Sequence, residues 1–248
     1  MASTKPLHAI YTAVLLLINL LALTQLVGAN PGTSTHYWDC CMPSCAWPNI
    51  APVTSPVRVC GVNDQWLNAL DPQNSCVYAP NQPVNMPAEQ AAWGDAFTCR
   101  NTAPWAVSDQ LAYGFAAVKI GWKNQWDTCC SCYHLTFTST AIAGKTMIVQ
   151  ATNTGTDLIE NQFDIMIPGG GVGIFGNHAC ERQWGEIDMG DQYGGFKGRE
   201  MCEQLPAQWR DGCRFRFDWY ENVGNPTVEW YEVACPAELT ALTGCKRT

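Results

Sequence analysis

Alternating apolar and polar positions mark several short segments along the chain. They occupy residues 132–138, 146–152, 162–167, 213–219 and 228–234. Turn-forming sequences separate them, including AGK at 143–145 and NVGNP at 222–226. A period of two bounded by turn residues is typical of β-strands, so the pattern predicts a mainly β protein.

Helical periodicity is confined to two segments, residues 104–117 and 236–242. Ser108 is expected to cap the second half of the first helix. Many short strands with few helices predict a closed or partly closed β-barrel with long loops. Because no repeat or linker interrupts residues 30–248, we expect one domain there.

The first 29 residues differ from the rest of the chain. Lys5 precedes an apolar stretch at 9–27, and the small residues around Gly28 and Ala29 suit a cleavage site. An uncleaved membrane anchor is the alternative, but polar residues interrupt the stretch. We therefore predict a signal peptide at 1–29 and a secreted mature chain without membrane association.

A long loop is expected between two cysteines, at residues 77–98. Three prolines precede a short segment, 88–92, that suits one or two helical turns. A loop of this length is either a functional flap or a tolerated surface insertion, and the sequence does not choose between them.

The fourteen cysteines all follow the predicted signal peptide. An even number in a secreted chain predicts disulfides, about seven of them, whereas a reducing cytosol would leave many exposed thiols. Zinc binding around Cys129, Cys130 and Cys132 is the alternative. The chain lacks paired C-x-x-C motifs and has few histidines, so we expect no metal.

The chain is acidic, with a formal net charge of -8. An acidic surface repels phosphate backbones, so nucleic acid is not an expected partner, whereas a neutral polysaccharide is compatible with this charge. Eleven tryptophans are present. Some must pack in the core and others could stack on sugar rings, but composition does not separate these roles.

Two other function classes find little support. Residues 171–176 (GVGIFG) match a dinucleotide-binding fingerprint, but we expect no helix directly after them. Their glycines more simply permit close approach of the backbone. Serine-nucleophile chemistry would need a G-x-S-x-G elbow, which the sequence lacks.

Two aspartates lie in apolar, aromatic surroundings, Asp39 in YWDCC and Asp164 in FDIMI. Glycosidic hydrolysis needs one carboxylic acid and one carboxylate, and an apolar setting raises a carboxyl pKa as the acid requires. The chemistry alone favours a hydrogen-bonded structural role for each, because perturbed carboxyl groups also occur in structural networks.

Residues 34–45 (STHYWDCCMPSC) resemble the signature of glycoside hydrolase family 45, whose members are endo-β-1,4-glucanases. The resemblance extends over the whole chain after the signal peptide. Further matching blocks are PWAV at 104–107, GFAA at 114–117, CCSCY at 129–133, FDIMIPGGGVGIF at 163–175, YGG at 193–195, FDW at 217–219 and CPAEL at 235–239.

The resemblance implies a six-stranded double-psi β-barrel with an open groove for a β-glucan. It implies cleavage within the chain, inversion at the anomeric carbon, no cofactor and a monomer. It assigns Asp39 as general base, Asp164 as general acid and Asp157 as an auxiliary carboxylate. Substrate contacts carry over to four further residues: Thr35, Tyr37, Trp47 and Ala117.

The resemblance also implies a disulfide pairing, which sequence alone does not select. The pairs are Cys40–Cys180, Cys41–Cys76, Cys45–Cys129, Cys60–Cys99, Cys130–Cys245, Cys132–Cys235 and Cys202–Cys213.

The chain departs from the family pattern near the site, in the loop GNHA at 176–179 and at two single positions. His36 stands where the signature usually has arginine, and Gln162 stands where a histidine precedes the acid. Two competing functions share the resemblance: the same mechanism on xyloglucan or glucomannan, and a non-hydrolytic, expansin-like wall-loosening protein. Expansins typically lack the base, so Asp39 favours the hydrolase.

Overall fold

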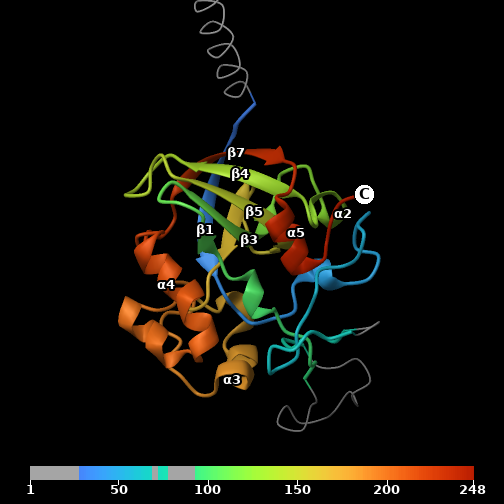
Figure 1. The fold of residues 1–248 in the computed structure, drawn as a ribbon, viewed down its shortest axis with the longest axis vertical. Helices are drawn as coiled ribbons and strands as arrows, with labels where there is room; N and C mark the ends of the chain where they lie inside the picture. The colour runs from blue at the N-terminus through green and yellow to red at the C-terminus, as the bar shows by residue number, and fades with distance from the viewer. Residues whose placement is uncertain (1–27, 69–71, 78–92) are drawn as a thin grey trace, which may run out of the picture.

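The computed structural model describes residues 28–68, 72–77 and 93–248. Seven strands form one sheet in the order β2-β3-β5-β4-β7-β1-β6, and pairing of β3 with β6 closes six of them into a barrel (Figure 1). This confirms the predicted six-stranded double-psi β-barrel. The strands are β1 (Asn30–Tyr37), β2 (Trp105–Ala106), β3 (Leu111–Lys119), β4 (Cys132–Phe137), β5 (Thr146–Asn153), β6 (Gln162–Met166) and β7 (Thr227–Val233).

Two parallel pairs lie within the otherwise antiparallel barrel. β1 runs parallel to β6, and β3 runs parallel to β5. β6 is therefore flanked by β1 on one side and by antiparallel β3 on the other. Because parallel neighbours cannot be joined by a tight turn, long connections leave this part of the barrel.

Short helices and 3₁₀ turns lie between the strands and after β7, and α3 and α4 lie beyond one end of the barrel (Figure 1). The helices are α2 (Gln125–Thr128), α3 (His178–Trp184), α4 (Arg210–Asp218) and α5 (Ala237–Thr243). The 3₁₀ turns are η1 (Ser44–Ala46), η3 (Arg100–Thr102), η4 (Gly173–Phe175), η5 (Arg199–Gln204) and η6 (Ala207–Trp209). No helix within the described ranges is long and apolar enough to cross a membrane.

The barrel interior is filled by side chains from alternate strand positions. Tyr133, Leu135, Val149, Phe163 and Ile165 are fully buried in one cluster. Tyr133 and Phe163 meet edge to face at 5.4 Å, a favoured geometry for aromatic rings. The barrel is therefore a packed core, and any binding site must lie outside it.

The predicted helix at 104–117 is wrong, because this segment forms β2, a turn and most of β3. Phe115, Ala116 and Ala117 are all buried, since β3 is covered on both faces. Burial of both faces removes the alternation by which a strand is recognised. The Ser108 hydroxyl accepts hydrogen bonds from the backbone of Gln110 and Leu111 in the hairpin turn instead of capping a helix.

The predicted strand at 213–219 is also wrong, because it lies within helix α4 and the residue after it. Phe215 and Trp219, one helical turn apart, stack with centroids 5.3 Å apart. Arg214, Arg216 and Asp218 give the segment its apparent alternation, but Arg216 is buried. The strands predicted at 132–138, 146–152, 162–167 and 228–234 and the helix at 236–242 correspond to β4, β5, β6, β7 and α5. β1 was not predicted.

Seven disulfides link the described residues. They have the pairing that the resemblance implies: Cys40–Cys180, Cys41–Cys76, Cys45–Cys129, Cys60–Cys99, Cys130–Cys245, Cys132–Cys235 and Cys202–Cys213. Cys132–Cys235 joins strand β4 to the segment after β7, and the other six pairs link loops and short helices to one another. Such links restrict the unfolded chain and fix loops whose own packing is limited.

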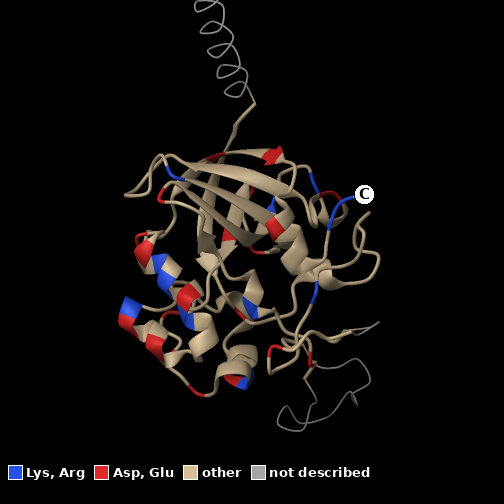
Figure 2. Ribbon diagram, viewed as in Figure 1, with Lys and Arg blue, Asp and Glu red and all other residues tan. Residues whose placement is uncertain are grey.

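Charged residues of both signs gather on α4 and η5, whereas the barrel strands carry few (Figure 2). Arg214 pairs with Asp211 and Glu203 there. Two expectations fall wholly or largely outside the described residues: the signal peptide at 1–29, of which only 28 and 29 are described, and the loop at 77–98, of which 78–92 are not.

Candidate active site

Three predicted site residues form a row across neighbouring strands on the outer face of the barrel. Thr35 on β1 lies opposite Asp164 on β6, and Asp164 lies opposite Ala117 on β3. Alternation along β6 explains the orientation, because Phe163 and Ile165 enter the core and Asp164 must then face outward. These strands therefore supply the floor of the site.

Asp39 reaches the site from a sharp turn just after β1. Cys40 has φ 62°, a left-handed conformation that side chains other than glycine rarely adopt. Cys40 is bonded to Cys180 and Cys41 to Cys76, so disulfides hold both residues that follow Asp39. The backbone N–H of Cys41 donates to Asp39 Oδ1 at 2.9 Å. The turn therefore fixes the Asp39 carboxyl group in one orientation.

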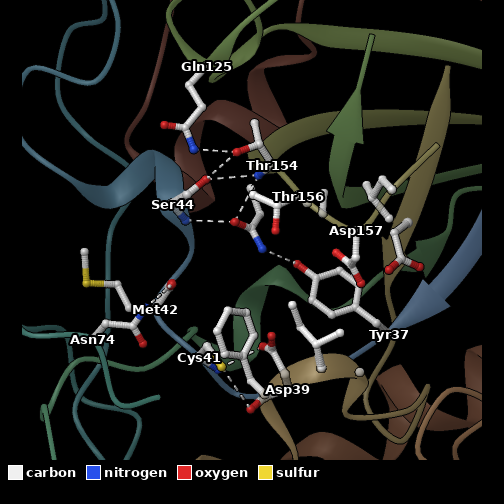
Figure 3. A pocket seen from close by; sticks show the side chains of 18 of the residues that line it. Tyr37, Asp39, Cys41, Met42, Ser44, Asn74, Gln125, Thr154, Thr156 and Asp157 are labelled. Atoms are coloured by element: carbon white, nitrogen blue, oxygen red, sulfur yellow. Dashed lines mark hydrogen bonds between the residues drawn. The ribbon is translucent and has the colours of Figure 1, made fainter. Parts of the chain in front are cut away.

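Two adjoining hollows make up the groove, with volumes of about 240 Å³ and about 370 Å³. Tyr37, Asp157 and Asp164 line both. Asp39, Trp47 and Ala117 line the first, and Thr35 lines the second. Figure 3 shows Tyr37, Asp39 and Asp157 directed into the first hollow. The structure thus brings all seven predicted catalytic and substrate-binding residues to one groove.

Burial raises the pKa of both candidate catalytic carboxyl groups. The pKa of Asp164 rises from its ordinary value of 3.8 to about 7, chiefly because the side chain is withdrawn from water, with contributions from Asp157 and Asp39. The pKa of Asp39 rises to about 6, again chiefly through burial, while the N–H of Cys41 opposes the rise. Asp164 therefore keeps its proton to a higher pH than Asp39 does.

A polar network holds Tyr37 against the groove. Asn153 Nδ2, at the end of β5, donates to the Tyr37 hydroxyl at 3.0 Å, and Asn153 Oδ1 accepts from the Ser44 backbone at 2.9 Å. The Ser44 hydroxyl meets that of Thr154 at 3.2 Å, and Gln125 donates to Thr154 (Figure 3). None of these four residues was predicted as part of the site; for Asn153 and Thr154 the available signal was the polar run TNTGTD at 152–157, which begins at the end of β5.

A loop of three glycines, 169–171, borders Asp164. Any side chain at Gly171, whose φ is +109°, would approach within 2.9 Å of the Gln192 carbonyl. This matches the expectation that the glycines of GVGIFG permit close backbone approach. The expectation that no helix follows them is wrong, because α3 begins at His178, with Cys180 tied to Cys40.

The buried side chains of His36 and Arg216 hold this glycine loop in place. His36 Nδ1 lies 2.8 Å from the Gly170 carbonyl, and Arg216 Nη1 donates to the carbonyls of Gly169 at 3.3 Å and Gly194 at 2.8 Å. Burial, with a further contribution from Arg216, lowers the pKa of His36 to about 4. His36 is therefore neutral at neutral pH, and it supports the loop without adding charge beside Asp164.

Exposed apolar groups flank the carboxyl groups. Ile174 and Phe175, on η4, are 48% and 51% exposed and line the first hollow. Trp47 directly follows η1 and lines the same hollow. Apolar side chains around a few convergent polar groups are typical of sites that bind small molecules or sugar rings. Within the described part of the chain, no cluster of three or more His, Cys, Asp or Glu side chains could hold a metal ion.

The sequence profile of Glycosyl hydrolase family 45 matches residues 31–246. An endoglucanase of Cryptopygus antarcticus is 41% identical over 231 residues, which cover 92% of this chain and 95% of that protein. An endoglucanase of Phaedon cochleariae is 41% identical over 218 residues, covering 86% of this chain and 83% of that protein. These two relatives match along most of their length.

The chain spans a smaller share of a Fusarium oxysporum relative, with 44% identity over 225 residues but only 56% of that protein's length. Among solved structures, the cellulase of the Antarctic springtail Cryptopygus antarcticus aligns with a TM-score of 0.77 and 43% identity. The alignment covers 89% of this chain and 98% of the springtail chain. The profile match and the relatives together show that the chain belongs to glycosyl hydrolase family 45.

Proposed function

We propose that the chain is a secreted endo-β-1,4-glucanase that hydrolyses internal bonds of cellulose-type glucans with inversion of configuration. Asp164 is the general acid and Asp39 the general base. The observation that carries this assignment is the pair of buried carboxyl groups in one groove, with the pKa of Asp164 near 7 and that of Asp39 near 6. Two carboxyl groups in one groove, of which the group with the higher pKa keeps its proton longer, suit an acid and base pair.

The bond changes follow from these protonation states. Asp164 transfers its proton to the glycosidic oxygen, and the bond between that oxygen and the anomeric carbon breaks with its electron pair on the oxygen. Asp39 accepts a proton from a water molecule, whose oxygen attacks the anomeric carbon from the opposite face. Asp157 stays close to both carboxyl groups, and its charge raises the pKa of each. This keeps the Asp164 proton in place until the leaving oxygen takes it.

The surroundings support a neutral polysaccharide as substrate. The groove is open and is lined by Tyr37, Trp47 and Phe175, whose rings suit the apolar faces of sugars. An open groove admits a chain along its length, which favours cleavage at internal bonds. Seven disulfides require an oxidising compartment, which supports secretion. All the named side chains come from one chain, as a monomeric enzyme requires.

Substitution of each carboxyl group tests the assignment. Asp164→Asn and Asp39→Asn should each lower hydrolysis of soluble cellulose by about 10²–10⁴-fold and leave oligosaccharide binding intact, because an amide neither donates an acidic proton nor accepts one from water. Asp109→Asn, in the exposed β2–β3 turn, is the matched control. Near-normal turnover by a folded Asp164→Asn variant would remove the acid assignment, and an inactive Asp157→Asn beside an active Asp39→Asn would move the base to Asp157.

The same groove also leaves a choice of glucan. A panel of cellulose, xyloglucan and glucomannan would separate the main proposal from the same mechanism on a decorated chain. Failure to hydrolyse any of them would support the expansin-like alternative. The position of Asp39 favours hydrolysis, because this candidate base is buried in the same hollow as Asp157 and Asp164.

A further inference from the structure

Gln162 lies two residues before Asp164 on β6 and on the same outer face of the barrel. It lines the second hollow together with Thr35 and Asp164. The mechanism described above gives Gln162 no part, so its contacts need a separate explanation.

The orientation of the Gln162 amide is fixed at its oxygen end. The backbone N–H of Ile159 donates to Gln162 Oε1 at 2.9 Å. Turning the amide over would place its NH₂ group against that N–H, leaving two donors in contact. Because the amide nitrogen must then point the other way, it acts as a donor, and Gln162 Nε2 donates to Thr35 Oγ1 at 2.9 Å.

This contact determines what the Thr35 hydroxyl does. A hydroxyl group has one proton to donate, and the lone pair facing Gln162 is already occupied. The proton is therefore directed to Asp164 Oδ1, to which Thr35 Oγ1 donates at 2.5 Å. Once Oδ1 accepts that bond, the protonated carboxyl group of Asp164 carries its own proton on Oδ2.

We propose that Gln162 is a positioning residue that, through the Thr35 hydroxyl, keeps the acid proton on Asp164 Oδ2 and supports the carboxylate that remains after proton transfer. The inference rests on the proposed role of Asp164 as general acid. No atom of Gln162 takes part in the bond changes. As the proton leaves Oδ2 for the glycosidic oxygen, the Thr35 hydrogen bond to Oδ1 becomes one to a charged acceptor and strengthens.

An amide suits this role because it does not titrate. The direction of the hydrogen bonds from Ile159 through Gln162 and Thr35 to Asp164 is the same before and after the acid ionises, and at every pH at which the enzyme is folded. A carboxylate at the same position would accept from both Ile159 and Thr35. The Thr35 proton would then turn away from Asp164, and the direction of the relay would be reversed.

Gln162→Glu tests the donor without removing the loop contact. A glutamate oxygen can still accept from the Ile159 N–H, so the loop that carries Asp157 keeps its anchor. We expect kcat to fall about 10-fold with little change in KM, less than the ~10²–10⁴-fold attributed to a proton-transfer group itself, because Gln162 acts only through Thr35. The alkaline limb of the kcat/KM profile, where Asp164 ionises, should move up by roughly one pH unit, because Asp164 loses a donor and gains a negative neighbour.

Several other groups act on Asp164 and are unchanged in this variant. Asp39 and Asp157 influence it electrostatically, and its own charge raises the pKa of the Tyr37 and Tyr220 hydroxyls. His36 lines the same hollow, and Lys119 lies opposite Gln162 on β3. An ion pair between Lys119 and the new glutamate would lessen the shift but would not restore a donor to Thr35. Gln110→Glu, at the exposed hairpin turn, adds the same charge away from the site and should leave the profile unchanged.

A double-mutant cycle separates positioning from a purely structural role. Gln162→Met removes the amide without adding charge, and Thr35→Val removes the hydroxyl through which Gln162 acts. If the inference is correct, Gln162→Met lowers kcat about 3- to 10-fold in the natural background and has little further effect in Thr35→Val, because contacting residues that act as a unit are not additive. Fully additive effects, or a Gln162→Glu variant with an unmoved alkaline limb, would overturn it.

Asp164→Asn, measured alongside, keeps this outcome apart from failure of the proposed function. An inactive Asp164→Asn variant together with unshifted Gln162 variants refutes only the positioning role. An active Asp164→Asn variant refutes the acid assignment on which that role rests.

Discussion

The carboxyl group of Asp164 should lower the stability of the folded protein at neutral pH, and Asp164→Asn should therefore stabilise it. Asp164 takes up its proton in the folded state with a pKa of about 7, against an ordinary value of 3.8. Between these two values, the unfolded chain releases the proton and the folded chain retains it. Stability contributed by the neutral carboxyl group is therefore complete below pH 4 and is lost as the pH rises to about 7.

The size of the effect follows from that difference. About 3 pH units at about 1.36 kcal/mol each correspond to roughly 4 kcal/mol above pH 7. Asparagine is neutral at every pH and retains an oxygen that can accept from Thr35. The stabilisation by Asp164→Asn should thus be near zero at pH 4 and approach roughly 4 kcal/mol at pH 8. For a domain of this size, that corresponds to a rise in Tm of about 8–16 °C.

Calorimetry of the purified protein at pH 4 and pH 8, with disulfides intact and no glucan present, measures this difference. Asp109→Asn removes an equal charge from an exposed turn and should leave Tm nearly unchanged at both pH values. Equal Tm values for Asp164→Asn and the natural protein at pH 8 would refute the argument. So would a difference of the same size at both pH values, since that would reflect packing and not ionisation.

Three other measurements follow from the site. The pH profile of kcat/KM should be bell-shaped with limbs near 6 and 7, because Asp39 must be ionised and Asp164 protonated. These two values belong to the coupled pair of carboxyl groups. Asp157→Asn should move both limbs to lower pH, and unmoved limbs would contradict the electrostatic role of Asp157. Proton NMR should detect the α-anomer first during hydrolysis of a β-glucan, whereas an initial β-anomer would exclude an inverting mechanism. The viscosity of soluble cellulose should fall well before much reducing sugar appears, and early release of one small sugar would contradict cleavage at internal bonds.

Much of the barrel could be predicted locally. β4, β5 and β7 alternate apolar and polar residues because one face of each packs in the core, so their pattern is visible in the sequence. β3 was mistaken for a helix because both faces are covered, and covering depends on segments distant along the chain. Stacking of Phe215 on Trp219 likewise stabilises a helix where the alternation of residues had predicted a strand.

The residues of the candidate site could likewise be predicted only in part. Apolar neighbours around Asp39 and Asp164, together with the family resemblance, identified the residues that carry the proposed chemistry. The resemblance also supplied the disulfide pairing, which cysteine spacing leaves open among many sets.

By itself, the sequence determined the strand periodicity and the cysteine content, because these depend on local pattern and composition. The tertiary structure alone decided that Thr35, Ala117 and Asp164 form one row, since this requires β1 and β3 to flank β6 in one register. It also decided the direction of the hydrogen bonds from Ile159 through Gln162 and Thr35 to Asp164. A hydrogen bond between residues 127 positions apart depends on how the barrel closes, and no local pattern records that.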